Sequence, residues 1–262
     1  MACEAAAQKS GYTVSLYNSF GVTDNEIEQL ELFNQQRVDA IVQIGGRVDD
    51  AETDQRYCDA VRKLPENLPL VVTGRLPEDV PSYSVEIDAE SGMDLVMEHL
   101  LGLGHTRIAL VGGRFDVKST REKVLLYEKI IRDHDIEFNP DYVANGSYSI
   151  ESGYECMKKV LKLSKLPTAV IAINDFAAAG VVRAIEDSGY RIPQDFSVAS
   201  FDNTYISDVM IPKLTSVDYN YEFFGQCLID TAIAASKGDD APRRQTVEPT
   251  LVTRESSGPS RA

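Results

Sequence analysis

The side chains with the clearest capacity for chemistry stand directly after short apolar runs that have the pattern of buried strands. They are Asn174 and Asp175 after Ala169–Ile173, Asp202 and Asn203 after Ser197–Phe201, Arg75 after Leu70–Thr73, and Tyr148 after Tyr142–Asn145. An Asp accepts two hydroxyl hydrogen bonds, an Asn donates and accepts, an Arg forks onto neighbouring oxygens, and a Tyr ring packs on the C–H face of a sugar. Open α/β sheets bind ligands at the carboxyl ends of their strands, so the pattern predicts a site for a small polar molecule.

Each of these residues also has a purely structural interpretation. Asn174 and Asp175 suit a helix N-cap, Asp202 suits an Asx turn, and Tyr148 suits packing within a lobe. Of the adjacent pair, we assign capping or bracing to Asp175 and ligand contact to Asn174. Asp202 is assigned to the ligand, and Tyr148 stays open between the two roles.

The sequence contains no motif for catalysis, and we expect neither an enzyme nor a cofactor. The patterns GxSxG, GxxxxGK[ST], HExxH and a strand-turn GxGxxG are all missing. The three histidines are far apart in sequence, which argues against a metal site. Gly45-Gly46 and Gly112-Gly113 each follow a strand and could face a phosphate, but tight turns explain them about as well.

Charge and cysteine content indicate the compartment and the partners. The formal net charge of -15 repels polyphosphates, so this chain should not bind DNA unaided. Four widely spaced cysteines without a CxxC pair favour a reducing compartment, the cytoplasm. No apolar run of about 18 residues and no signal-peptide pattern are visible, so we expect no membrane contact.

Strand and helix patterns alternate along most of the chain, which predicts an α/β fold of parallel sheets with crossover helices. The predicted strands are Tyr12–Tyr17, Ala40–Ile44, Leu70–Thr73, Arg107–Val111, Tyr142–Asn145, Ala169–Ile173, Ser197–Phe201 and Thr215–Val217. The predicted helices are Asp24–Gln35, Ala51–Leu64, Ser91–Leu103, Thr120–Asp133, Ile150–Leu163, Ala177–Ser188 and Tyr221–Ser236. Two extended runs split by Pro249 follow the last helix.

We expect two doubly wound parallel-sheet lobes joined by several strands. The N-terminal lobe is predicted to hold residues 1–104 and about 216–240, and the C-terminal lobe residues 105–215 and about 241–255. The tail 256–262 is expected to be frayed. The chain opens in what reads as the end of a helix, Ala2–Ser10, so we also expect that a first strand is missing and that residues precede Met1.

The ordered motifs of the chain resemble the LacI/GalR family of bacterial repressors over essentially the whole length. The motifs are RVDAI (37–41), EHLLGLGHTRIA (98–109), VGG (111–113), ESGY (151–154), PTAVIAIND (167–175), IPQDFSVASFDN (192–203), PKLTSV (212–217) and LVTRES (251–256). Any one of these motifs is weak, whereas the ordered set is specific.

The resemblance implies a fold similar to type I periplasmic binding proteins, a homodimer, and a small-molecule effector held between the lobes. Effector binding would alter the affinity for operator DNA of a helix-turn-helix headpiece, which is absent from this chain. By position in the family's motifs, Asp202 would bond the ligand, Asn174 and Tyr148 would line the cleft, and Ser119 would lie in a loop that touches the ligand.

Departures from the family pattern concern two of the implied contacts. Lys123 stands where the family usually has a ligand-gripping arginine, and a lysine lacks the planar fork of a guanidinium. Gly74-Arg75 stands where many members carry Asp-Arg, so one polar partner is lost.

The leading hypothesis is therefore the effector-sensing domain of a transcriptional regulator, a repressor, with a sugar favoured over a purine as effector. The alternative is an extracytoplasmic sugar-binding protein of an ABC-type transporter, which would share the two-lobed fold. The regulator-like runs and the unpaired cysteines favour the first hypothesis.

Overall fold

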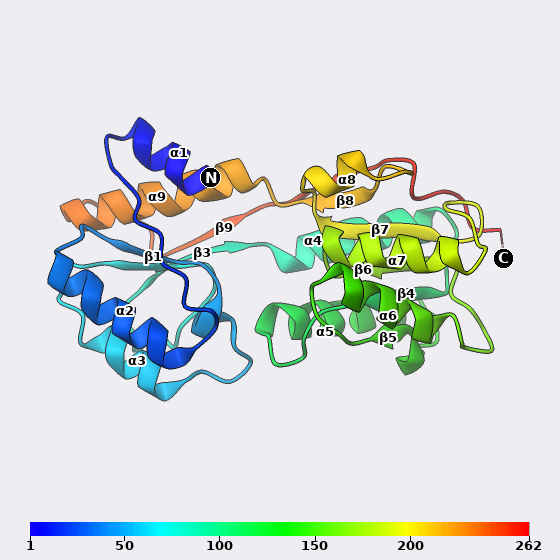
Figure 1. The fold of residues 1–262 in the computed structure, drawn as a ribbon, viewed down its shortest axis with the longest axis horizontal. Helices are drawn as coiled ribbons and strands as arrows, with labels where there is room; N and C mark the ends of the chain where they lie inside the picture. Colours follow the sequence, from blue (N-terminus) through cyan, green and yellow to red (C-terminus); the bar gives the residue numbers. More distant parts are fainter. Residues whose placement is uncertain (262) are drawn as a thin grey trace. The chain divides into compact units, whose positions relative to one another are not determined.

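The β-branched runs of the chain form two separate sheets, one of four strands and one of six. The computed structural model describes residues 1–261, and the chain divides into two units around these sheets. Unit 1 comprises Met1–Ile87 and Asn220–Val247, and unit 2 comprises Asp88–Tyr219 and the chain from Glu248 onward. Three segments connect the units, because the chain crosses after Ile87, after Tyr219 and after Val247 (Figure 1).

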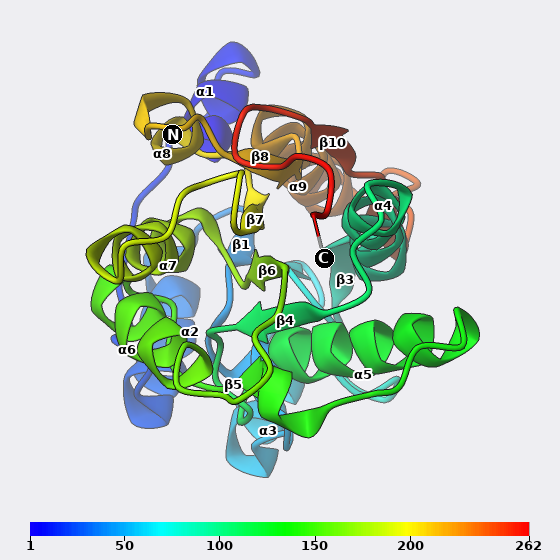
Figure 2. The ribbon, with the colours of Figure 1, turned by 90° about the vertical axis from the view of Figure 1, so that its right-hand side faces the viewer.

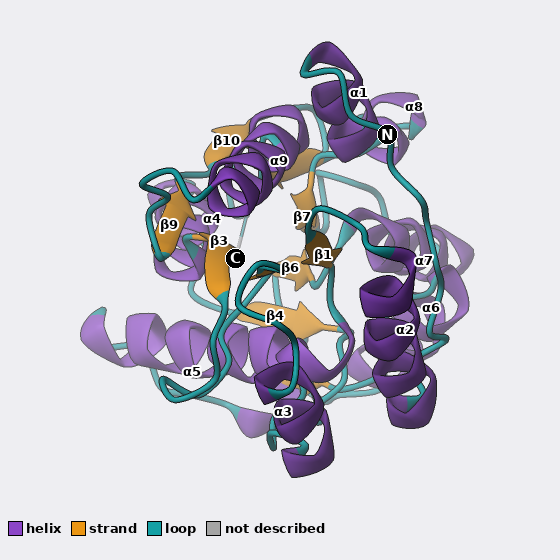
Figure 3. Ribbon diagram, turned by 90° about the vertical axis from the view of Figure 1, so that its left-hand side faces the viewer, coloured by secondary structure: helices purple, strands orange, loops and turns teal. Residues whose placement is uncertain are grey.

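In unit 1 the sheet is parallel throughout. Its strands run in the order β1 (Ile41–Gln43), β2 (Leu70–Val72), β3 (Tyr83–Ile87) and β9 (Arg244–Val247). Four helices cover it, α1 (Ala2–Lys9), α2 (Thr23–Gln36), α3 (Gln55–Arg62) and α9 (Tyr221–Lys237), with a 3-10 turn at Gly46–Asp49. Leu70 and Val72 pack toward α2 and α3, whereas Val71 packs toward α9. The alternation of a strand thus serves two helix layers (Figure 3).

In unit 2 the sheet has the order β10 (Thr250–Val252), β8 (Thr215–Asp218), β7 (Ser197–Asp202), β6 (Ala169–Ala172), β4 (Ile108–Val111) and β5 (Val143–Ala144). Only β10 is antiparallel to its neighbour. The helices are α4 (Ala89–Gly102), α5 (Lys118–Asp133), α6 (Ile150–Val160), α7 (Asp175–Asp187) and α8 (Tyr205–Val209), with a 3-10 turn at Pro140–Tyr142. Helices α4 and α5 lie on one face of this sheet, and α6 and α7 on the other (Figure 2).

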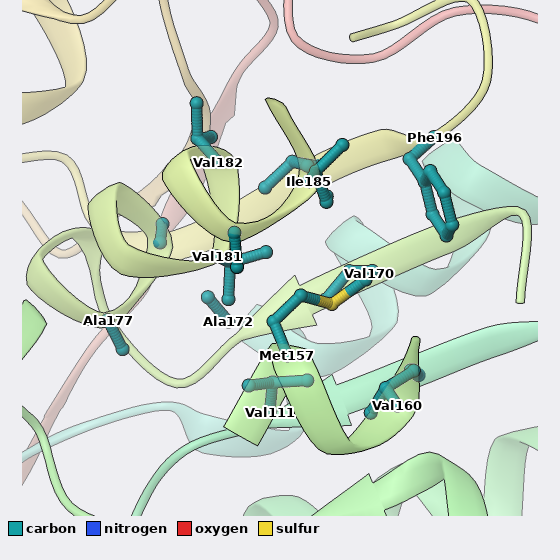
Figure 4. Packing of buried hydrophobic residues seen from close by; sticks show 14 of the residues in the cluster. Val111, Met157, Val160, Val170, Ala172, Ala177, Val181, Val182, Ile185 and Phe196 are labelled. Carbon is teal, nitrogen blue, oxygen red and sulfur yellow. The ribbon is translucent and has the colours of Figure 1, made fainter. Parts of the chain in front are cut away.

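The core of unit 2 forms between α6, α7 and the central strands. Val181 and Ile185 of α7, Met157 of α6 and Val170 of β6 are fully buried in one cluster (Figure 4). The helices α6 and α7 cross at two glycines: a Cβ on Gly180 would stand 1.9 Å from the carbonyl oxygen of Ile150, and one on Gly153 would stand 2.1 Å from that of Ala177. The crossing therefore requires residues without a side chain.

The predicted α/β class, two doubly wound sheets connected by several segments, is confirmed, but the boundary placed after residue 104 is wrong. Helix α4 belongs to unit 2, so the first crossing lies between Ile87 and Asp88. Gly92 lies within 4 Å of Pro249 and Val217 once a Cβ is placed on it, and the helix buries Met93, Val96, Met97 and Leu100 completely. Strand β3 ends unit 1 instead, although its sequence was not predicted as a strand.

The residues after the last long helix also divide differently from the prediction. The prediction gave residues 241–255 to the C-terminal lobe, but Arg244–Val247 pairs with β3 in unit 1. After β9 the chain returns to unit 2 at Glu248. Pro249 separates the two strands as expected, since proline cannot donate to a ladder.

Residues 12–17 form no strand, in contrast to the prediction. No strand of the described chain pairs with them, and Leu16 is 91% exposed. An apolar alternation without a hydrogen-bonding neighbour leaves the backbone groups to water, so the segment stays irregular.

The tail predicted to be frayed is instead bonded to unit 2 as far as Ser260. Ser256 is fully buried, its hydroxyl donates to the Val198 carbonyl at 2.6 Å, and Gly258 N–H donates to the Ser197 hydroxyl at 2.9 Å. The His105 ring contacts the Gly258 carbonyl at 2.9 Å. Burial lowers the pKa of His105, which favours the neutral imidazole. The prediction of a frayed tail was wrong because the hydrogen-bond partners of these polar residues lie far away in the sequence.

The glycine crossing makes a direct prediction about stability. Gly180→Ala should lower the free energy of unfolding by about 1–3 kcal/mol, the usual cost of forcing extra atoms into a packed core. Gly102→Ala is the matched control, because a Cβ at that helical position meets nothing within 4 Å. It should change stability by no more than about 1 kcal/mol, on the stabilising side. Urea unfolding of both variants measures this, and equal midpoints would show that α6 and α7 do not cross as described.

Candidate functional site

The carboxyl ends of four parallel strands in unit 2 meet at one edge of the sheet, and five of the six predicted site residues follow these ends. Ser119 and Lys123 come from α5, which follows β4. Tyr148 follows β5, Asn174 follows β6, and Asp202 is the last residue of β7. Open α/β sheets place ligands at such an edge, so the topology supports the position that the sequence indicated.

Asp202 and Asn203 form a turn with an unusual backbone. Both have a positive φ, 101° at Asp202 and 46° at Asn203, a region that L-residues seldom occupy. Three hydrogen bonds of Asn203 hold the turn in place. Its N–H donates to the Ser216 hydroxyl at 3.0 Å, its Nδ2 donates to Asp218 at 3.0 Å, and its Oδ1 accepts from Arg254 at 2.8 Å. Strained residues held in this way concentrate at functional sites.

Arg254 anchors the same turn from the end of the chain. Its Nη1 donates to the Leu214 carbonyl at 2.8 Å, and its Nε lies 3.3 Å from the Asp208 carboxylate. The guanidinium is largely buried, with 12% of its side chain exposed. The LVTRES run therefore braces the turn, a function that its composition did not predict.

In the adjacent pair, Asn174 takes the capping role that the sequence analysis had offered to Asp175. Asn174 is the N-cap of α7, because its Oδ1 accepts from the Ala177 N–H at 2.8 Å. Its Nδ2 group takes no part in this cap. Asp175 does not cap the helix. It is fully buried and accepts from the Ser200 hydroxyl at 2.6 Å, so bracing is the role that the structure gives it.

Lys123 is buried, and its ammonium group lies over two aromatic rings. Its Nζ lies 5.1 Å from the centre of the Phe201 ring and 5.8 Å from that of Tyr219, and these two rings stack on each other. Phe201 precedes Asp202 directly, so the lysine and the turn share one neighbourhood. The aromatic pair was not predicted.

Tyr148 and Ser119 lie near the start of α5. The Tyr148 hydroxyl is 2.8 Å from that of Thr120, and its ring packs against the core of unit 2. Ser119 is in the first turn of α5 and not in a loop as predicted, because the helix begins at Lys118. Half-buried Tyr148 thus has the packing role that was left open, with part of its surface exposed.

Arg75 is the one predicted site residue that belongs to unit 1. It follows β2, its side chain is 62% exposed, and its Nε pairs with Glu86.

Within residues 1–261 no group of three or more His, Cys, Asp or Glu side chains could hold a metal ion. In the same range, no helix combines the length and the apolar character needed to cross a bilayer.

Comparisons with known proteins bear on the class of this chain. Residues 97–257 match the model of the periplasmic binding protein-like domain. The repressor PurR of Aliivibrio fischeri (strain MJ11) is 29% identical over 251 residues, which cover 95% of this chain and 73% of the relative. The lac repressor dimer bound to operator and the anti-inducer ONPF superposes with a TM-score of 0.85 at 27% identity, over 98% of this chain and 87% of that chain. The regulator CcpA of Lactococcus lactis, at 24% identity, 98% and 92% coverage and a TM-score of 0.85, shares the fold.

The fold and the match over residues 97–257 thus define a periplasmic-binding-protein-like domain, and the chain belongs to that family. More particularly, it is the effector-binding domain of a LacI/GalR-family transcriptional repressor. The predicted family and fold class are confirmed.

The turn at Asp202 makes a prediction that separates backbone strain from side-chain chemistry. The free energy of unfolding of Asp202→Gly should be about 1 kcal/mol higher than that of Asp202→Ala, because glycine adopts a positive φ without the steric cost that alanine meets. Both variants lack the carboxylate, so their difference in urea unfolding reports the backbone alone. Equal stability would mean that Asp202 does not hold the positive φ in solution.

Proposed function

We propose that this domain binds a sugar at the carboxyl edge of the unit 2 sheet and that binding changes the operator affinity of a DNA-binding headpiece. The observation that carries the proposal is the position of Asp202. This residue is the last of β7, and its backbone is held at a positive φ in the turn that follows. A preorganised carboxylate at a sheet edge accepts two hydroxyl groups without first ordering the protein.

The other residues of this edge fit a polyol. Asn174 Nδ2 can donate to a hydroxyl oxygen, Tyr148 offers part of a ring to the C–H face of a sugar, and Ser119 adds a hydroxyl. Lys123 would supply one donor where a guanidinium would supply two. The site is proposed to act in the cytoplasm, with no cofactor and no catalytic step.

A purine base is the second candidate. Relatives matched by sequence carry the name PurR, and a base presents N–H groups and ring nitrogens to the same Asp and Asn side chains. A role in transport is less well supported, because the matched relatives named above are repressors or transcription regulators.

A thermal-shift screen of this chain tests the proposal. The panel is D-glucose, D-galactose, cellobiose, hypoxanthine and guanine, each over a concentration series. A ligand at 100 times its Kd should add about 2.7 kcal/mol to the stability. Asp202→Ala should abolish the shift while the ligand-free protein stays folded.

Glu151→Ala is the control, because Glu151 is an exposed acid in the first turn of α6. It should leave the shift unchanged. A shift by a purine and by no sugar would replace the proposed effector class, and a shift that survives Asp202→Ala would exclude the carboxylate as a contact.

We also propose a homodimer in which a second copy of this chain covers the exposed face around α8. Tyr205, Val209 and Ile211 are 71%, 66% and 88% exposed in a short segment. Large apolar side chains that gather on a surface mark interfaces more often than isolated ones do. The solved lac repressor structure is that of a dimer.

Val209→Glu should shift the sedimentation of the protein from dimer toward monomer, because the charge would be buried in the interface. Leu125→Glu is the matched control, since Leu125 is equally exposed at 65% but lies on α5. Dissociation by the control alone would place the interface elsewhere, and a wild-type monomer at all concentrations would exclude the dimer.

A further inference from the structure

The Asp175 carboxyl group is buried and accepts hydrogen bonds from hydroxyl groups and a backbone N–H. The residue has 0% exposure. One carboxylate oxygen accepts from the hydroxyls of Ser200 at 2.6 Å and Ser216 at 2.8 Å. The other accepts from the N–H of Thr204 at 2.5 Å and from its hydroxyl at 2.9 Å. Burial of a charge is tolerated when its lone pairs are satisfied in this way.

These bonds lead away from the helix that carries Asp175. The N-cap of α7 is Asn174, so the helix does not need the Asp175 side chain for its first amides. Ser200 lies in β7, Ser216 lies in β8, and Thr204 lies two residues after Asp202. The Asp175 carboxylate therefore binds β7, β8 and the turn that follows β7.

The turn depends on this point in two ways. Asp175 binds the backbone of Thr204 directly. It also accepts the hydroxyl proton of Ser216, which orients that hydroxyl so that its lone pair receives the N–H of Asn203 at 3.0 Å. Both residues that follow Asp202 are thus held, one directly and one through Ser216.

We propose that Asp175 is a positioning residue that fixes the backbone of the Asp202–Thr204 turn and so aims the Asp202 carboxylate at the effector. The role in effector binding rests on the function proposed above, whereas the control of the turn stands on the contacts alone. The requirement is for acceptor oxygens at this place and not for negative charge at the ligand.

Two substitutions distinguish these requirements. Asp175→Ala removes both acceptors. Asp175→Asn keeps one oxygen for the Thr204 N–H, and the serine hydroxyls can rotate to accept from its amide. If charge were the requirement, Asn would be as damaging as Ala. Under our proposal Asp175→Asn keeps most of the order of the turn and most of the ligand affinity. Glu151→Ala again serves as the control for an acid in a first helical turn.

The first measurement needs no ligand. Hydrogen–deuterium exchange of peptides that cover residues 202–208 should be about tenfold faster or more in Asp175→Ala, near the wild-type rate in Asp175→Asn, and unchanged in Glu151→Ala. Peptides from β6 should keep their protection, which excludes general unfolding. Should Asp175→Ala fail to fold, the Asp175→Asn and Ser216→Ala proteins carry the test, and Ser216→Ala should accelerate the same peptide.

The second measurement is the Kd of whichever panel compound stabilises the wild type. Asp175→Ala should weaken it roughly 10- to 100-fold, as expected when the support of a charged hydrogen-bonding group is lost. The Kd of Asp175→Asn should lie within a few-fold of the wild-type Kd.

The outcomes separate the two proposals. Unchanged exchange at residues 202–208 in Asp175→Ala overturns the positioning role, whatever the ligand result. Equal Kd values for the Asn and Ala variants overturn it in favour of a charge effect. If no panel compound stabilises the wild type, the sugar or purine effector is wrong, while the exchange data still decide the role of Asp175.

Discussion

The arrangement of unit 2 depends on one constraint: β7 is buried from Ser197 to Phe201, and this buried part carries two serines. Ser197 and Ser200 have no exposed surface, as is true of Val198 and Ala199 between them. A buried hydroxyl without a partner costs about 1–3 kcal/mol, so the surrounding chain must supply hydrogen bonds at both places. Ser197 obtains them from the segment at Gly258. Ser200 obtains one from Asp175.

The same constraint explains how the turn at the carboxyl edge of the sheet is held in place. Once Asp175 is placed to satisfy Ser200, its remaining lone pairs reach Ser216 and Thr204, and the turn between β7 and α8 is fixed. Arg254 then closes the outer side of the turn through Asn203. A positive φ at Asp202 can persist because so many bonds around it would break together.

Sequence patterns recovered the elements whose burial is one-sided or complete and missed those that depend on distant partners. The runs at Ala169–Ala172 and Ser197–Asp202 were placed within one residue, since buried parallel strands are continuous apolar runs. Strand β3 was missed, because Ser84 and Glu86 interrupt its apolar pattern and its strand character comes from β2 and β9. That omission also moved α4 into the wrong unit.

For the site, residue type and strand-end position were enough to select Asp202 and Asn174 as candidates. They were not enough to divide the work between Asn174 and Asp175. Both suit a cap, and only the placement of Ser200, Ser216 and Thr204 shows that one of them supports the turn. Long-range partners of this kind leave no local pattern in a sequence.

The bonded segment at Ser256–Ser260 has a practical consequence for anyone who would turn this domain into a biosensor. Gly258 meets Ser197, the first residue of β7, whereas Asp202 is its last residue. At about 3.3 Å per residue the two lie roughly 16 Å apart along the strand. A fluorophore attached near Gly258 would therefore report on the amino edge of the sheet and leave the carboxyl edge unobstructed. Cutting the chain before Ser256 to shorten such a fusion would leave the Ser197 hydroxyl and the His105 ring without that partner inside the protein.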